Sequence, residues 1–293
     1  MPLSKLQFKP GINREGTNYS NEGGWFDGDK IRFRNGLPER IGGWTRVSNT
    51  QVTGTPRKIF DFVTLDSQNL LFIGTEQKVF LENAGTFNDI TPIRSTVSLG
   101  ANPVNTTGGA GSGVVTITTQ ASHAASTGDF VTLASLTATD GITAEQLNTE
   151  HKITSVPSTT TFTITTAGSA SSGSTAGGGS SGTAAFQIGV GLNSTVLGAG
   201  WGAGTWGRFT WGSAAGSLSG QTLRLWSVDN FGEDLLFNNM DGSIFYWDAT
   251  NGTSTRGVLL SSLAGASDVP IVARKLLVSD VDRHVIVFGT NPI

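Results

Sequence analysis

Leu70-Leu71-Phe72-Ile73-Gly74-Thr75, followed by Val79-Phe80-Leu81, is the stretch on which the predicted fold depends. Later in the chain, Leu235-Leu236-Phe237 is followed at the same separation by Ile244-Phe245-Tyr246. Short apolar runs of this kind, bounded by turn residues, are typical of buried strands. Their recurrence indicates a repeated pair of strands.

Two further features extend the repeat. An apolar run precedes each stretch, Ile59–Val63 in the first copy and Leu223–Trp226 in the second. A third copy begins at Arg274–Val278 and leads to Val285–Thr290, echoing Arg57–Phe60 and the strand after it. Strands repeated at the length of a blade are typical of propellers and similar arrays, with chance similarity between apolar strands as the alternative. We predict an all-β fold of propeller-like blades, with helix confined to a turn or two near Ala144–Asn148.

Composition narrows the class of protein. The 293 residues include 40 glycines and only 14% charged residues, which suits many turns and little exposed helix. No cysteine is present, so disulfides, thiol nucleophiles and thiolate metal sites are excluded. The sequence has no apolar run long enough to span a membrane and no signal-peptide core, and we expect no membrane span.

Charge is unevenly distributed but nowhere strongly basic. Residues 95–187 contain four acidic side chains and one basic one, which accounts for the net charge of -3. The other 200 residues carry 18 acidic and 18 basic side chains. Nucleic-acid binding usually requires a basic excess, so any DNA is expected to pass by without sequence-specific binding.

Changes in composition predict five segments. Residues 95–187 are rich in Thr, Ser and Gly and read as a small β-barrel or sandwich inserted between two blades. Its predicted strands are Val114–Thr118, Phe130–Leu133, Lys152–Val156 and Thr161–Thr165, with a flexible, exposed joint at Ala167–Gly182. The segments in order are an extended N-terminal arm (1–24), a first propeller-like segment (25–94), the insert (95–187), a Gly/Trp-rich loop (188–216), and the second and partial third units (217–293).

A hairpin is predicted close to the N-terminus. Asp29–Arg34 alternates polar and apolar residues, and Asn35-Gly36 is a strong signal for a two-residue turn because both residues tolerate positive φ. The basic side chains here could form a binding patch, but a solvated strand face is favoured because Asp27, Asp29 and Glu39 are nearby. The basic cluster consists of Lys30, Arg32, Arg34 and Arg40.

Three tryptophans recur at every fifth residue within a glycine-rich stretch. Trp201, Trp206 and Trp211 follow neither a strand nor a helix period. Indoles on such a loop can bind a protein partner, stack on sugars, enter a membrane interface, or fold back onto the core. We assign partner contact and self-packing equal weight, ahead of sugar binding. If these tryptophans contact a partner, we expect at least two of the three to be buried by another chain.

No catalytic constellation stands out. His123, His151 and His284 are far apart and lack metal-ligand spacing. Asp280 and Asp282 alternate with His284 and could share a face, but a solvated loop explains them, as it explains Asp27 and Asp29. Phosphate-loop, nucleophile-elbow and dinucleotide motifs are absent from the sequence. We predict a protein that is not an enzyme and has no catalytic, cofactor or metal-binding residues.

The last apolar strand is a predicted protein interface. Val285-Ile286-Val287-Phe288 is apolar throughout, and a free edge strand of this kind invites association. We expect Ile286, Val287 and Phe288 to be covered by another chain or by the N-terminal arm.

The order of several segments resembles that of a known family. Gly24–Trp44 reads GWFDGDKIRFRNGLPERIGGW, and Ser122-His123 with Gly128–Val131 marks the Thr-rich insert. The Gly/Trp loop follows, and then Asp229–Leu235, which reads DNFGEDL. This order resembles the tail nozzle (stem) proteins of short-tailed bacteriophages and covers most of the chain.

The resemblance implies a function and partners. It implies a structural virion protein, assembled in the host cytoplasm, that forms a homo-oligomeric ring, typically a hexamer, in the viral tail. Such a ring continues the DNA ejection channel below the portal. The other implied partners are adaptor or head-to-tail connector proteins and a tail fibre, needle or other tail protein. Family members are usually longer, so we expect either completion of the propeller by another polypeptide or a shortened, incomplete one.

A second function class stays open from the residues themselves. The chain could be a host-surface glycan-recognition module of a phage or bacterial surface protein, binding through Trp201, Trp206 and Trp211. Ring assembly would favour the nozzle, whereas glycan binding by a monomer would favour the recognition module.

Overall fold

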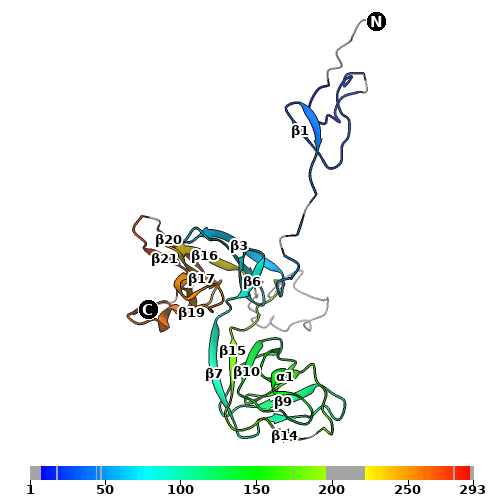
Figure 1. Cartoon of the computed structure of the whole chain (residues 1–293). Coiled ribbons are helices and arrows are strands. Elements are labelled where there is room, and N and C mark those ends of the chain that lie inside the picture. Colours follow the sequence, from blue (N-terminus) through cyan, green and yellow to red (C-terminus); the bar gives the residue numbers. More distant parts are fainter. Residues whose placement is uncertain are drawn as a thin grey trace, which may run out of the picture. The chain divides into compact units, whose positions relative to one another are not determined.

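The computed structural model describes residues 8–17, 19–43, 45–46, 48–173, 175–195, 222–279 and 281–290. The chain divides into two compact units, Met1–Asn49 and Thr50–Ile293 (Figure 1). Regular structure is almost entirely β, apart from α1 (Ala144–Leu147) and the 3-10 turns η1 (Ala249–Asn251) and η2 (Leu260–Ser262). The predicted all-β class is confirmed, and α1 lies where a helical turn was expected. Within the described ranges, no helix has the length and hydropathy that a membrane span needs.

The first unit is built around the predicted hairpin. Strands β1 (Ile31–Arg34) and β2 (Leu37–Arg40) pair antiparallel across Asn35 and Gly36, whose φ angles are 51° and 81°. Both turn residues therefore adopt the left-handed conformation that a tight hairpin requires. The hairpin prediction is confirmed.

Residues ahead of the hairpin fold back onto Trp25. Lys9 N donates to Gly23 O over 2.7 Å, and Ile12 forms a single bridge with Trp25. The Phe8 ring lies 5.6 Å from the Trp25 ring. The described part of the predicted arm is thus tied to the hairpin. The predicted segment 25–94 spans both compact units, because the hairpin packs with the residues before it and the first blade begins later.

The first blade is a four-stranded antiparallel meander. Its strands pair in sequence order, as predicted for the first repeat. Leu70 and Phe72 alternate with residues of the other face, so the two side chains are buried on the same face. The strands are β3 (Pro56–Val63), β4 (Asn69–Thr75), β5 (Val79–Asn83) and β6 (Thr86–Asp89).

The second blade repeats this topology. Its strands are β16 (Trp226–Phe231), β17 (Asp234–Asn239), β18 (Ile244–Trp247) and β19 (Val258–Leu259). Its first strand differs from the predicted Leu223–Trp226, because only Trp226 belongs to the ladder. The turn between β16 and β17 contains Gly232, where φ is 74°. This turn pairs Phe231 with Asp234 and so fixes the register of the earlier residues of β16. Arg224 N instead donates to Leu192 O, outside the sheet.

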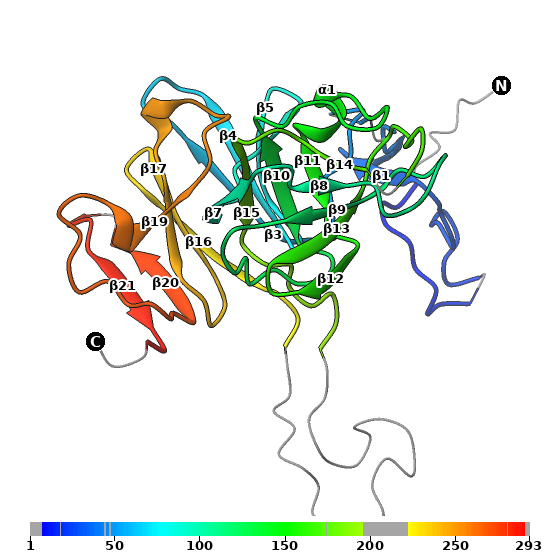
Figure 2. The ribbon, with the colours of Figure 1, turned by 90° about the horizontal axis from the view of Figure 1, so that it is seen from below.

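The two blades pack face to face through aromatic side chains. Phe72 and Phe237, both fully buried, have ring centroids 5.4 Å apart, and the Trp226 ring lies 6.2 Å from Phe237. Figure 2 shows β16 of the second blade beside β3 of the first. The Trp226 indole N–H donates to Thr75 O over 2.7 Å. Gly74 lies under this indole, and a Cβ there would be 2.5 Å from Trp226 Cδ1. The glycine in the repeat therefore permits the close approach of the blades.

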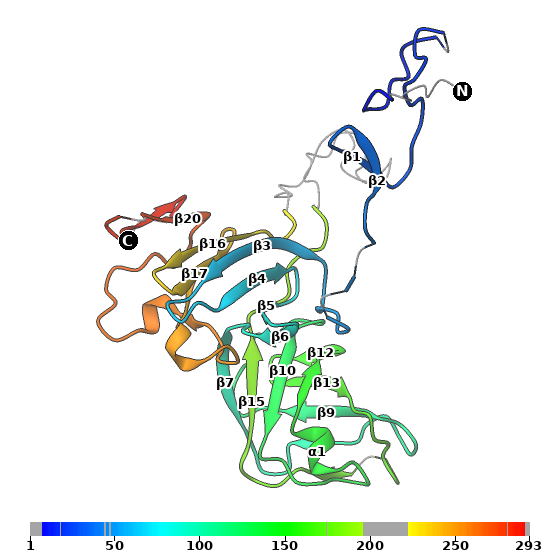
Figure 3. The same cartoon turned by 45° about the horizontal axis from the view of Figure 1, so that its top comes forward.

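A third unit follows the second blade. It is a hairpin of β20 (Lys275–Val278) and β21 (Val285–Phe288), as predicted. Ser227 Oγ donates to Leu276 O over 3.1 Å and Asp229 accepts from Val278 N at 2.8 Å, which join β16 to β20. The first strands β3, β16 and β20 lie side by side (Figure 3). This arrangement is that of successive propeller blades.

The insert is a sandwich of two open sheets. Their strand orders are β11-β10-β15-β7 and β12-β13-β9-β8-β14, with no closed barrel in the described residues. Phe162, Phe186, Ile117 and Leu133 lie in a separate core between the sheets. The strands are β7 (Ile93–Gly100), β8 (Val104–Asn105), β9 (Val114–Thr118), β10 (Phe130–Ala134), β11 (Glu150–Lys152), β12 (Ser155–Ser158), β13 (Thr161–Thr165), β14 (Ala176–Gly177) and β15 (Gly182–Gln187).

Two details of the insert differ from prediction. The single strand expected at Lys152–Val156 is divided between the sheets, with β11 beside β10 and β12 beside β13. Ile153, 1% exposed, lies at the corner where the chain changes partners. The joint expected to be flexible and exposed contributes β14, and Gly178 O accepts from Thr137 N at 3.1 Å. Backbone hydrogen bonds, which composition does not reveal, order this segment.

Candidate functional site

The predicted interface strand exposes one face. Leu277, Ile286 and Phe288 lie on the same side of the β20–β21 hairpin, and 46%, 44% and 52% of their surfaces are exposed. Val287 points to the other side and packs against the cluster containing Leu276. The strand is thus not exposed throughout, because alternation sends Val287 toward the second blade.

A second apolar face lies at the other end of the array. Ile59 and Val63 on β3 are 58% and 55% exposed, while Phe60 and Phe62 on the same strand pack toward the second blade. The first and third units therefore each present exposed apolar side chains on the face that does not contact the second blade. Exposed apolar patches of this kind mark interaction surfaces.

The described residues on either side of the Gly/Trp-rich loop are held by hydrogen bonds. Trp201, Trp206 and Trp211 lie outside the described residues. On either side, Arg224 N donates to Leu192 O over 2.9 Å, and Arg57 donates to Asn193 O over 2.7 Å. Both described flanks of the loop are therefore held beside the first blade.

A charged cluster connects the blades to the insert. Lys78, the residue before β5, is 5% exposed and donates to Asp89 over 2.8 Å and to Glu150 of the insert. Arg256, after η1, lies 3.4 Å from both carboxylates. The cluster has two positive and two negative charges, so its buried charge is balanced.

The surroundings of this cluster favour its ionised form. Burial alone would raise the pKa of Asp89, but hydrogen bonds with Lys78 and Thr91 and the charge of Arg256 hold that pKa below its usual value. Lys78 Nζ also lies 4.5 Å above the centre of the Phe130 ring. No sequence pattern marks these residues, since they lie far apart and only folding brings them together.

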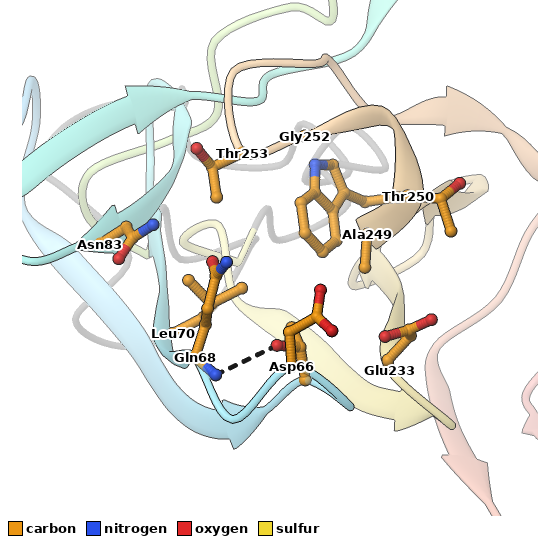
Figure 4. Close-up of a pocket in the computed structure, with 11 residues that line it drawn as sticks. Asp66, Gln68, Leu70, Asn83, Glu233, Ala249, Thr250, Gly252 and Thr253 are labelled. Carbon is orange, nitrogen blue, oxygen red and sulfur yellow. Dashed lines mark hydrogen bonds between the residues drawn. The ribbon is translucent and has the colours of Figure 1, made fainter.

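A cavity of about 350 Å³ opens between the first and second blades. It is lined by Thr64, Asp66, Gln68, Leu70, Asn83, Glu233, Trp247, Ala249, Thr250, Gly252 and Thr253. Figure 4 shows polar side chains from both blades, among them Asp66, Asn83 and Glu233, around the cavity. Leu70 and Trp247 are the most buried of the lining residues. No sequence motif marks this site, because its residues come from separate turns and strands of the two blades.

Local hydrogen bonds hold the cavity walls. In the β3–β4 turn, Ser67 N donates to Thr64 O over 2.9 Å, and Gln68 N donates to Thr64 Oγ1 over 3.2 Å. Across the two blades, Leu65 N donates to Glu233 Oε2 over 3.2 Å. These bonds position Asp66 and Gln68 at the rim while leaving their side chains without a hydrogen-bond or ion-pair partner in the described part of the chain.

The opposite wall is held in the same way. Asp234 accepts from Ala249 N at 2.9 Å, and Asp248 caps η1 by accepting from Thr250 N at 2.9 Å. The Trp247 indole N–H donates to Thr255 O over 3.0 Å, so the polar atom of this buried side chain is already paired. The cavity therefore has polar walls above a base that buried apolar side chains close.

The other residues singled out in the sequence form no shared site. His123 is buried against Phe186 in the insert core, and His151 Nε2 lies 3.0 Å from Leu147 O. Burial lowers the pKa of His151. Asp282 and His284 are exposed in the β20–β21 turn, and Asp280 lies outside the described residues.

The acidic and basic residues near the hairpin pair with one another at the surface. Arg14 pairs with Asp27, Lys30 with Asp29, and Arg32 with Glu39. This pairing fits the favoured interpretation of a solvated strand face. Across the described residues, no group of three or more His, Cys, Asp or Glu is arranged to hold a metal ion.

Comparisons with known proteins assign no family to this chain. No family model matches the chain. No curated protein matches it. Phage phi92 endosialidase is similar over 75% of this chain and 31% of its own length, with 13% sequence identity and a TM-score of 0.26. A score at this level supports no inference about function.

Proposed function

We propose that the chain is a structural virion protein of a short phage tail, assembling as a ring that continues the DNA ejection channel. The observation that carries this proposal is the pair of apolar faces at opposite ends of the blade array. One contains Ile59 and Val63, and the other contains Leu277, Ile286 and Phe288. The resemblance of the sequence to tail nozzle proteins supplies the phage tail and the adaptor as context.

The packing inside the chain suggests how copies associate. Successive units already contact one another through the faces of β3, β16 and β20. A contact between the β3 face of one copy and the β20–β21 face of the next would repeat the same mode of packing. Such head-to-tail contacts generate rings when the rotation closes. No catalysis, cofactor or metal is part of this proposal.

Paired face variants test the contact. Ile286→Asp with Phe288→Asp blocks one face, and Ile59→Asp with Val63→Asp blocks the other. Each variant alone should remain monomeric, whereas an equimolar mixture should form a dimer that does not extend. Light scattering and negative-stain images of the wild type should show closed rings.

A matched control separates the interface from general surface effects. Val281 is 90% exposed in the β20–β21 turn, and Val281→Asp should assemble as the wild type does. A wild-type chain that stays monomeric at high concentration, alone and with its adaptor, would refute the proposal. Unchanged rings in both face variants would refute the proposed contact.

The alternative, a host-surface glycan-recognition module, depends on Trp201, Trp206 and Trp211, which lie outside the described residues. Glycan binding that is lost when these three residues become Ala, in a chain that never assembles, would favour that function over the ring.

A further inference from the structure

We propose that the cavity between the first and second blades binds an uncharged pyranose unit of a glycan. This site is separate from the apolar end faces and from the tryptophan loop. It therefore adds a ligand to the proposed tail protein without depending on its assembly.

Size and shape support a small ligand. The volume of about 350 Å³ lies at the lower end of the range for small-molecule sites, roughly 300–1,000 Å³. A cavity of this size holds one or two sugar rings. Both of its walls are held by hydrogen bonds from backbone N–H groups to carbonyl or carboxylate oxygens, so little ordering is needed when a ligand binds.

The polar groups match a ligand rich in hydroxyls. Asp66 and Glu233 supply carboxylate acceptors, while Gln68 and Asn83 both donate and accept. A hydrogen bond from a hydroxyl to a carboxylate is stronger than one between neutral groups. Asp66 and Gln68 are exposed and their side chains have no partner among the described residues, so a ligand would displace only water from them.

Two apolar residues close the base of the cavity. Leu70 and Trp247 are 2% and 1% exposed, and the indole N–H of Trp247 is already bonded to Thr255 O. The base therefore seals the cavity, and recognition of the ligand is left to the polar groups of the walls.

Charge excludes other ligand classes. The cavity lining contains two carboxylates and no Lys, Arg or His. Phosphates, sialic acids and nucleotides would be repelled. A divalent metal is disfavoured, since the described residues hold no suitable group of three His, Cys, Asp or Glu side chains.

Binding is measured by saturation-transfer NMR with methyl glycosides of gluco, galacto and manno configuration, followed by an array of neutral and sialylated oligosaccharides. We expect binding of at least one neutral pyranoside and none of the sialylated glycans. Asp66→Asn and Gln68→Ala should each weaken binding about tenfold or more, the effect of losing a hydrogen bond that involves a charged group or strands a polar one.

Controls keep the result specific to the cavity. Asp282→Asn makes the same change at an exposed aspartate outside the cavity and should leave binding unchanged. Matching thermal unfolding of Asp66→Asn and wild type excludes a folding defect. The assay is repeated on the Ile286→Asp, Phe288→Asp variant, which should still bind sugar, so failure of assembly and failure of the cavity are read separately.

Three outcomes would overturn the proposal. One is the absence of any neutral pyranoside signal at millimolar concentration. Another is an equal loss of binding in Asp66→Asn and Asp282→Asn. The third is Asp66-dependent stabilisation by calcium or by a diamine with no sugar binding, which would identify a cation site instead.

Discussion

Replacing Lys78 by Met tests how the blades hold the insert. The substitution keeps much of the side-chain volume but removes the ammonium group that contacts Asp89 and Glu150. Arg256 then remains as the single cation facing two carboxylates. The cluster changes from neutral to a net charge of -1 in a largely buried place.

The burial of the cluster determines how much unfolding free energy Lys78→Met should lose. Removing one partner of a buried ion pair costs about 3–5 kcal/mol, because an uncompensated charge is left behind. The carboxylates of Asp89 and Glu150 keep 22% and 29% of their side-chain exposure, so water screens part of the remaining charge. We therefore expect the lower end, about 3 kcal/mol, or a fall in melting temperature of roughly 6–12 °C.

Chemical denaturation at pH 7 and at low pH provides the assay. The folded-state pKa of Asp89 is lowered, so its stabilising contribution is present above the unfolded value near 3.8 and is lost as the pH falls through the folded pKa. The difference between Lys78→Met and wild type should shrink below about pH 4 as Asp89 becomes neutral.

Two variants make the test specific. Lys152 is exposed, lies 5.9 Å from the same Phe130 ring and forms no ion pair among the described residues, so Lys152→Met is the matched control and should cost little. Adding Glu150→Gln to Lys78→Met restores charge balance and should recover part of the loss. Equal stability of Lys78→Met and wild type, or equal losses at Lys78 and Lys152, would refute the reasoning.

Two further predictions concern the blade contact and the insert. Gly74→Ala places a Cβ 2.5 Å from Trp226 Cδ1 and should reduce the free energy of unfolding by about 1–3 kcal/mol, measured by urea denaturation; an unchanged midpoint would show that the blades separate freely. Ile188 N lies 3.0 Å from Pro92 O, so the two ends of the insert are close together. Excising residues 93–187 and joining Pro92 to Ile188 with a short Gly/Ser linker should therefore leave the blades folded. Their core contains no insert residue, so loss of cooperative unfolding would contradict this expectation.

Local patterns were enough to predict much of the fold. The recurrence of Leu70–Thr75 at Leu235–Phe237 located two blades, and Asn35-Gly36 located the first hairpin. These signals are local because strand alternation and left-handed turn residues act through neighbouring residues. The first strand of the second blade was misplaced, since its register depends on pairing with β17 and not on its own hydropathy.

The candidate sites depended on the tertiary structure. Residues that line the cavity come from loops as far apart as Asp66 and Glu233, and no short motif links them. The charged cluster likewise joins Lys78 to Glu150, which are 72 positions apart. The sequence by itself determined most of the segments that become strands and which residues are polar. Only the packing of one blade on the next decided which polar side chains meet, because contacts between distant segments form when their buried faces share a core.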